Sequence, residues 1–197
     1  MGVVADCEYT KLNGGTQNAT QQILTNWNTV SLLYKSTFNI SLGIIELQIQ
    51  DTTYVPSSHN RYPKIDLPPL PSCPASDTAN PWNVACGSVS LNERLSLFSA
   101  WRGQKSDNLN GANDPSGLWH LMSGCPSGTE VGVAWLGTVC NQKATGNAPS
   151  VVSGTAVSTG GRTEWQVVAH EIGHNFGAIV SAFSIPSPAI HPNEIVL

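Results

Sequence analysis

Charged residues are scarce in this chain. Only 11% of its 197 residues are Asp, Glu, Lys or Arg, against about 25% in an average soluble protein. The formal net charge is -4, so the sequence offers no basic surface for nucleic acid. No apolar run approaches the roughly 20 residues that a membrane-spanning helix needs. We therefore expect neither a nucleic-acid partner nor a transmembrane segment in this chain.

Several common functional motifs are also missing. The sequence has no G-x-S-x-G nucleophile turn, no phosphate-binding loop and no C-x-x-C pair. Scattered cysteines speak against a cysteine zinc site and favour disulfides formed in an oxidising compartment, although five reduced, buried thiols are the alternative. An odd number leaves one cysteine unpaired, and a bond between Cys73 and Cys86 would close a short loop. The five are Cys7, Cys73, Cys86, Cys125 and Cys140.

What is present is the composition of one globular domain, with 40% hydrophobic residues. The patterns predict helices over 20–37 and 90–101, the second capped by Ser90 or Asn92. They predict strands over 41–50, 118–122 and 131–140, with 51–86 as a loop. His59 is expected in a loop and His120 in a strand, and we interpret both as surface or packing residues rather than metal ligands.

The most informative stretch is 163–178, because it contains His170-Glu171-Ile172-Gly173-His174, the H-E-x-x-H pattern. Residues four apart on a helix lie almost above one another, so both imidazoles project from one face. Neutral imidazoles are good zinc ligands. Glu171 would reach a water in the open zinc position, where it can act as general base.

The predicted helix around this motif has recognisable ends. Thr163 and Gln166 match a capping box at its start. Gly177 is placed to end it in a left-handed turn that residues with a Cβ resist. An apolar side chain recurs every four residues, at Val168, Ile172 and Phe176, and forms a stripe to bury beside the histidines.

The run H-E-I-G-H-N-F-G resembles the active-site helix of the metzincin zinc endopeptidases, and N-F-G within it is most similar to the adamalysin (reprolysin, ADAM) branch in its fungal form. Other parts of the chain are similar to the same catalytic domain, so the resemblance covers residues 1–179. These parts are 1–7, 41–47, 94–102, 118–124 and 132–140.

The resemblance implies an α/β (α+β) zincin-like domain, with a mixed, mostly parallel twisted sheet and helices flanking the cleft. It implies Zn²⁺ as cofactor, His170 and His174 as metal ligands, and Glu171 as the catalytic general base for peptide-bond hydrolysis. The strand at Gly132–Gly137 is expected to bind a protein or peptide substrate as an added strand. Cys140 is expected to be the unpaired cysteine.

The resemblance ends at residue 179, so we expect an incomplete catalytic domain over 1–179, with its lower subdomain incomplete, and a non-homologous tail over 180–197. The family's third histidine would fall at position 180, where this chain has Val180. Val180-Ser181 can be encoded by a splice-donor sequence, which suggests a retained intron. Glu194 and His191 are alternative third ligands, and the spacing of Glu194 resembles thermolysin-like peptidases, which place that glutamate on a second helix.

The start of the chain has no basic region and no apolar stretch of the kind found in signal peptides. Two glycosylation sequons, at Asn18 and Asn39, fit a secreted parent protein, of which this chain would be a monomeric fragment. The favoured function is a zinc metalloendopeptidase. The alternative is an incompetent fragment or pseudoprotease that acts, if at all, as a protein-binding module.

Overall fold

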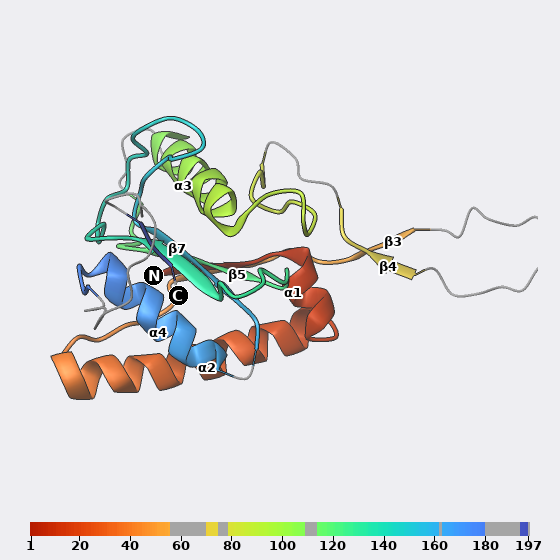
Figure 1. Ribbon diagram of the computed structural model, residues 1–197. Helices are drawn as coiled ribbons and strands as arrows, with labels where there is room; N and C mark the ends of the chain where they lie inside the picture. Colours follow the sequence, from red (N-terminus) through yellow and green to blue (C-terminus); the bar gives the residue numbers. More distant parts are fainter. Residues whose placement is uncertain (56–69, 75–78, 109–113, 162, 180–193, 197) are drawn as a thin grey trace, which may run out of the picture.

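The computed structural model describes residues 1–55, 70–74, 79–108, 114–161, 163–179 and 194–196 (Figure 1). The tail at 180–193, including Val180 and His191, lies outside these residues, as does His59. The helices are α1 (Cys7–Leu12), α2 (Thr16–Phe38), α3 (Leu91–Asn108) and α4 (Glu164–Asn175). The strands are β1 (Gly2–Ala5), β2 (Glu46–Ile49), β3 (Thr53–Val55), β4 (Leu70–Ser72), β5 (Trp119–Ser123), β6 (Gly132–Trp135), β7 (Thr155–Thr159) and β8 (Glu194–Val196).

One sheet of six strands forms the centre of the molecule, in the order β2-β1-β5-β7-β6-β8. The pairs β2–β1, β1–β5 and β5–β7 are parallel, whereas β6 runs antiparallel to both β7 and β8. Every residue of β1, β5 and β7 is buried, as expected when helices cover both faces of a parallel sheet. The mixed, mostly parallel sheet predicted from the sequence is therefore confirmed.

Helices lie on both faces of the sheet: α3 covers one face, and α2 and α4 lie on the other (Figure 1). Alternate residues of a strand point to opposite faces, and β1 follows this rule. Val3 and Ala5 pack in the core beneath α2 and α4, while Val4 packs in the core beneath α3. The sheet thus carries two separate apolar cores, and α4 belongs to the first.

Local signals explain the two long helices. In α2, Ile23, Trp27, Val30 and Tyr34 form a buried stripe. The Ser90 hydroxyl accepts a bond from the Glu93 N–H at 3.2 Å, and the Glu93 carboxylate accepts one from the Ser90 N–H at 2.8 Å. This is a complete capping box at the start of α3, so the predicted cap at Ser90 is confirmed.

The sequence-based boundaries differ from the structure in several places. The expected loop 51–86 contains β3 and β4, which pair antiparallel. The expected strand 131–140 ends at Trp135, because the chain turns at Gly137 with a left-handed φ of 66°. The helix predicted to end at residue 101 continues to Asn108. None of the helices within the described ranges is long and apolar enough to cross a membrane.

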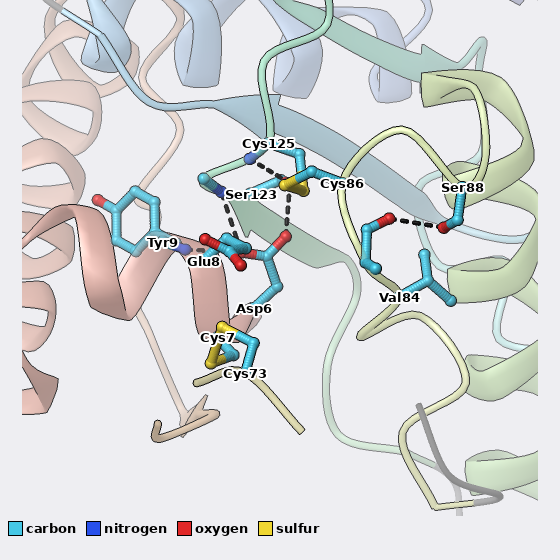
Figure 2. The surroundings of a disulfide bond; sticks show 12 residues. Asp6, Cys7, Glu8, Tyr9, Cys73, Val84, Cys86, Ser88, Ser123 and Cys125 are labelled. Carbon is cyan, nitrogen blue, oxygen red and sulfur yellow. Dashed lines mark hydrogen bonds between the residues drawn. A yellow bond between two sulfur atoms is a disulfide. The ribbon is translucent and has the colours of Figure 1, made fainter. Parts of the chain in front are cut away.

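The disulfides join Cys7 to Cys73 and Cys86 to Cys125, so the expected Cys73–Cys86 bond is wrong (Figure 2). Cys7 follows β1 and Cys125 follows β5, and these strands are parallel neighbours whose ends meet at one edge of the sheet. Each cysteine therefore finds a partner from the segment that passes this edge, which short spacing in the sequence does not reveal. Cys140 is free and exposed, as predicted.

The buried carboxylate of Asp6 lies between these two disulfides (Figure 2). The Asp6 carboxylate, 1% exposed, accepts bonds from the Tyr9 N–H at 2.8 Å, the Gly124 N–H at 2.9 Å and the Ser123 hydroxyl (Figure 2). Nη1 of the buried Arg94 guanidinium lies 3.4 Å from Oδ2 of Asp6. Burial raises the pKa of Asp6, and these donors act in the opposite direction. We call this set the Asp6 cluster.

Candidate active site

Helix α4 carries all three predicted site residues, and it packs against β6, β7 and α2. The His170 and His174 rings lie one turn apart with centroids 4.3 Å from each other and planes at 86°. Glu171 is 0% exposed and His174 is 2% exposed, while His170 is half-buried. The i, i+4 spacing therefore places both imidazoles on one helix face, with the carboxylate beside them.

The start of α4 is held by tertiary contacts. The predicted capping box is wrong, since the Thr163 side chain makes no capping hydrogen bond. Instead the buried Glu164 carboxylate accepts hydrogen bonds from the Tyr9 hydroxyl and the Asn26 amide. These two residues come from α1 and α2, so the first turn of α4 is fixed by long-range bonds that a local motif cannot encode.

The end of α4 agrees with the prediction. Gly177 has a left-handed φ of 96°. Its N–H donates to the His174 carbonyl at 2.8 Å, and the Ala178 N–H donates to the Gly173 carbonyl at 2.9 Å. This is the Schellman arrangement, which satisfies carbonyls that the helix leaves open. A residue with a Cβ at position 177 would be strained there.

Asn175 fixes the last turn of α4 to the sheet. Its side-chain amide donates to the Trp135 carbonyl at 2.9 Å, the Thr155 carbonyl at 3.0 Å and the Thr138 hydroxyl at 3.1 Å. These acceptors lie at the end of β6, in β7 and in the turn between them. In the sequence Asn175 stands out only as part of the metzincin-like run, because no local pattern shows which strands its side chain meets.

The tautomer of His174 follows from its surroundings. Its Nδ1 lies 2.8 Å from the Ala178 carbonyl oxygen, and a carbonyl can only accept, so Nδ1 carries the hydrogen. The Nε2 atom is then left with a free lone pair. Orientation of a ligating imidazole through its other nitrogen is typical of metal sites.

Four buried polar atoms of the motif have no hydrogen-bond partner within the described residues. They are Nε2 of His170, Nε2 of His174 and both carboxylate oxygens of Glu171. Burial raises the pKa of Glu171 to about 9. Burial, with a smaller effect of His174, lowers the pKa of His170 to about 4 and keeps its imidazole neutral.

These unpaired atoms fit a zinc ion. Buried polar groups in folded proteins nearly always have partners, and two neutral imidazole nitrogens with an adjacent carboxylate are a donor set that zinc accepts. Zinc needs a third protein ligand, and the described part of the chain contains no group of three or more His, Cys, Asp or Glu suited to a metal. Glu194 begins strand β8, so the helix that the thermolysin-like alternative needs at this residue is not formed.

An apolar pocket of about 260 Å³ opens beside the two histidines, between α4 and the last turns of α2. Leu33 and Phe38 of α2 line it, together with Ile179, and all three keep much of their surface exposed, at 39%, 60% and 72%. The two imidazoles thus form part of the lining of a largely apolar pocket.

Comparison with known proteins now identifies the family. A profile described as metallo-peptidase family M12 matches residues 1–179. The chain belongs to this family. This match confirms the assignment to the adamalysin branch of the metzincin peptidases that the sequence predicted.

Fungal relatives agree with this assignment. The chain is 39% identical over 184 residues to a protein of Aspergillus fumigatus named "Disintegrin and metalloproteinase domain-containing protein B", covering 91% of this chain and 20% of that protein. A protein of the same name from Arthroderma otae is 38% identical, with 91% and 21% covered. "Zinc metalloprotease mde10" of Schizosaccharomyces pombe is 29% identical, with 91% and 33% covered. The chain therefore spans between a fifth and a third of the length of these M12 relatives.

A solved structure described as a chaperone-substrate complex contains a chain of similar fold. The TM-score is 0.53 at 13% sequence identity, and the match covers 90% of this chain and 22% of that chain. At this identity the likeness shows the fold alone.

The remaining described histidine is a core residue, as predicted. His120 is fully buried in β5, its Nε2 lies 2.8 Å from the Ser158 hydroxyl, and its ring packs edge-on against Trp27. Burial lowers the pKa of His120 to about 3, so it is neutral at physiological pH. It lies in the sheet and does not join the α4 motif.

Proposed function

We propose that this M12 chain carries the active-site helix of a zinc-dependent endopeptidase, with His170 and His174 as metal ligands and Glu171 as the catalytic general base. The observation that supports this most is the set of unpaired buried atoms on α4. A helix that only packs in a core has no reason to bury two imidazole nitrogens and a carboxylate without partners, since each costs free energy there.

Each residue then has one task. His170 and His174 would hold Zn²⁺ through Nε2, and the hydrogen bond from Nδ1 of His174 to the Ala178 carbonyl leaves its Nε2 free for this role. When bound, zinc polarises the peptide carbonyl and lowers the pKa of a water molecule. Glu171, whose ionised form a bound metal ion would favour, would take the proton from that water and pass it to the leaving amine.

We propose that the substrate is a protein or peptide that binds in extended form beside β6. This strand packs against α4 on the side that carries Glu171. The edge of β6 is paired with β8 in the structure, so a peptide would take the place of β8 there. The proposal includes a single catalytic domain over 1–179, acting as a monomer in a secreted parent protein. The two disulfides support an oxidising compartment.

The test is the zinc affinity of the purified chain at neutral pH, measured beside Val180→His and His174→Ala. Weak binding that Val180→His strengthens, and that His174→Ala removes, is the expected result. Binding that His174→Ala leaves unchanged would overturn the assignment of the ligands. Glu171→Gln should then abolish peptide cleavage by the Val180→His protein without loss of zinc or of the folded state.

A second function has one observation in its favour. The described residues supply two histidine ligands and no third, and even changes around a metal's ligands cost about 10- to 100-fold in affinity or activity. A chain that does not retain zinc would act only by binding other proteins. In that case Glu171→Gln would leave every measurable binding property unchanged.

A further inference from the structure

Strand β6 meets the general base at a position where it has no side chain. A Cβ atom built on Gly132 would lie 2.4 Å from Oε1 of Glu171 and 2.8 Å from its Cδ. Carbon and oxygen atoms that are not bonded do not approach this closely, so one of the two groups would have to move. The Glu171 carboxylate therefore occupies the space that any other residue at position 132 would fill.

The glycine is not needed for the backbone. Seven of the glycines that the structure describes have the left-handed conformation that favours glycine, and Gly132 is not among them. Gly132 is the first residue of β6 and pairs with Ser158 in the regular register between β6 and β7, where glycine offers no side chain for packing. What the position requires is the absence of a side chain.

We propose that Gly132 is a positioning residue for Glu171, which rests on the proposed function. The missing side chain of Gly132 leaves room for the carboxylate directly beside the backbone of β6. No described side chain bonds the carboxylate in place. Its position therefore depends on the space that its neighbours leave, and a methyl group at position 132 would take part of that space.

Another neighbour must be separated from this effect. The same Cβ would lie 2.7 Å from Cγ1 of Val167, one turn before Glu171 on α4. Gly132→Ala could then disturb α4 through Val167 rather than through the carboxylate. Combining Gly132→Ala with Glu171→Ala and, separately, with Val167→Ala distinguishes the two contacts.

The first measurement is thermal melting of the metal-free chain. Gly132→Ala should lower Tm by roughly 5 °C, as expected for overpacking in a domain of this size. In the Glu171→Ala background the same change should lower Tm by less than about 2 °C. Gly43→Ala is the matched control, because a Cβ there meets nothing within 4 Å, and it should not change Tm.

The second measurement is peptide cleavage by the Val180→His protein at saturating zinc. Gly132→Ala should reduce kcat about 100-fold, since a displacement of about 1 Å can have that effect. The KM for peptide and the zinc affinity should stay within about threefold, which a general loss of structure would not allow. Gly43→Ala should leave all three unchanged.

The outcomes separate the inference from the function on which it rests. Melting needs neither zinc nor cleavage, so a chain that does neither refutes the proposed function and still tests Gly132. A Tm loss relieved by Val167→Ala and not by Glu171→Ala overturns the positioning role. If Gly132→Ala does not fold, folding of the double variant with Glu171→Ala supports the role. Failure of every Gly132→Ala variant to fold overturns it.

Discussion

Two of the buried carboxyl groups, those of Asp6 and Glu171, are in opposite circumstances. Asp6 receives four donors, among them the Arg94 guanidinium and the Ser123 hydroxyl. Glu171 receives none from the described residues, although it is as deeply buried. Asp6 lies between β1 and α1 as the N-cap of that helix, and Glu171 lies within α4. They differ in whether the fold supplies the carboxyl group with hydrogen-bond partners.

This difference is what we expect between a structural group and the proposed catalytic one. A buried polar group without partners costs about 1–3 kcal/mol or more, so a sequence selected for stability alone would replace it. The Asp6 cluster needs nothing from outside the chain. The α4 motif leaves its buried polar atoms without partners among the described residues, and the contacts of Glu164, Tyr34 and Asn175 hold the helix in place regardless.

The largest expected effect is on the Asp6 cluster. Asp6→Asn removes the partner of Arg94 and leaves a buried guanidinium uncompensated, so the free energy of unfolding should fall by about 3–5 kcal/mol. Urea denaturation at pH 7 with the disulfides intact measures it. Glu8→Gln is the control, because Glu8 pairs with Lys11 in an exposed bridge whose loss should cost about 0.5 kcal/mol or less. Equal losses for the two variants would contradict the comparison.

The next effect concerns a buried group whose burial costs free energy only when it is charged. His120 has a folded-state pKa of about 3, below its ordinary value of 6.5. The unfolded chain therefore binds more protons between these values, so stability is present above pH 6.5 and is lost as the pH falls toward 3. At pH 4 the loss should be about 3 kcal/mol relative to pH 7.

His120→Gln, which cannot take up a proton, isolates this contribution. The difference in unfolding free energy between the variant and the unaltered chain should change steadily in the variant's favour from pH 7 to pH 4. Carboxylates such as Asp6 titrate in both proteins and cancel in the difference. A difference that stays constant with pH would show that His120 is solvated.

The local features of the site could be predicted from the sequence, whereas its long-range contacts could not, for a physical reason. The motif of His170, Glu171 and His174, the turn at Gly177 and the cap at Ser90 depend on residues within one or two turns of each other. The disulfide partners, the anchoring of Glu164 by Tyr9 and the contact of Gly132 with Glu171 depend on strand order. These contacts join residues that lie far apart in the chain, so neither the hydrophobic periodicity nor a local motif predicts them.

Replacing Glu171 should have a smaller effect on stability than replacing Asp6, and one of opposite sign. Glu171→Met exchanges an unpaired buried carboxylate for an apolar side chain of similar length, so the metal-free chain should gain about 1–2 kcal/mol. Denaturation in the presence of a chelator measures it. A loss of more than about 1 kcal/mol would mean that Glu171 has a stabilising partner after all, and the contrast with Asp6 would fail.

The smallest effect tests how the two helices that carry these clusters are held. Helix α3, which bears Arg94, begins with the Ser90–Glu93 capping box, so Ser90→Ala should cost about 1 kcal/mol. Helix α4, which bears Glu171, begins at Thr163 without a side-chain cap, so Thr163→Ala should cost no more than a few tenths of a kcal/mol. Chemical denaturation of both variants measures the two losses of unfolding free energy.

Equal costs would mean that Thr163 contributes a local bond, and that α4 does not depend on Glu164 and Asn175 for its position. Unequal costs would show that the helix with the open site is placed by the whole fold, which is what holding its ligands in a fixed position requires.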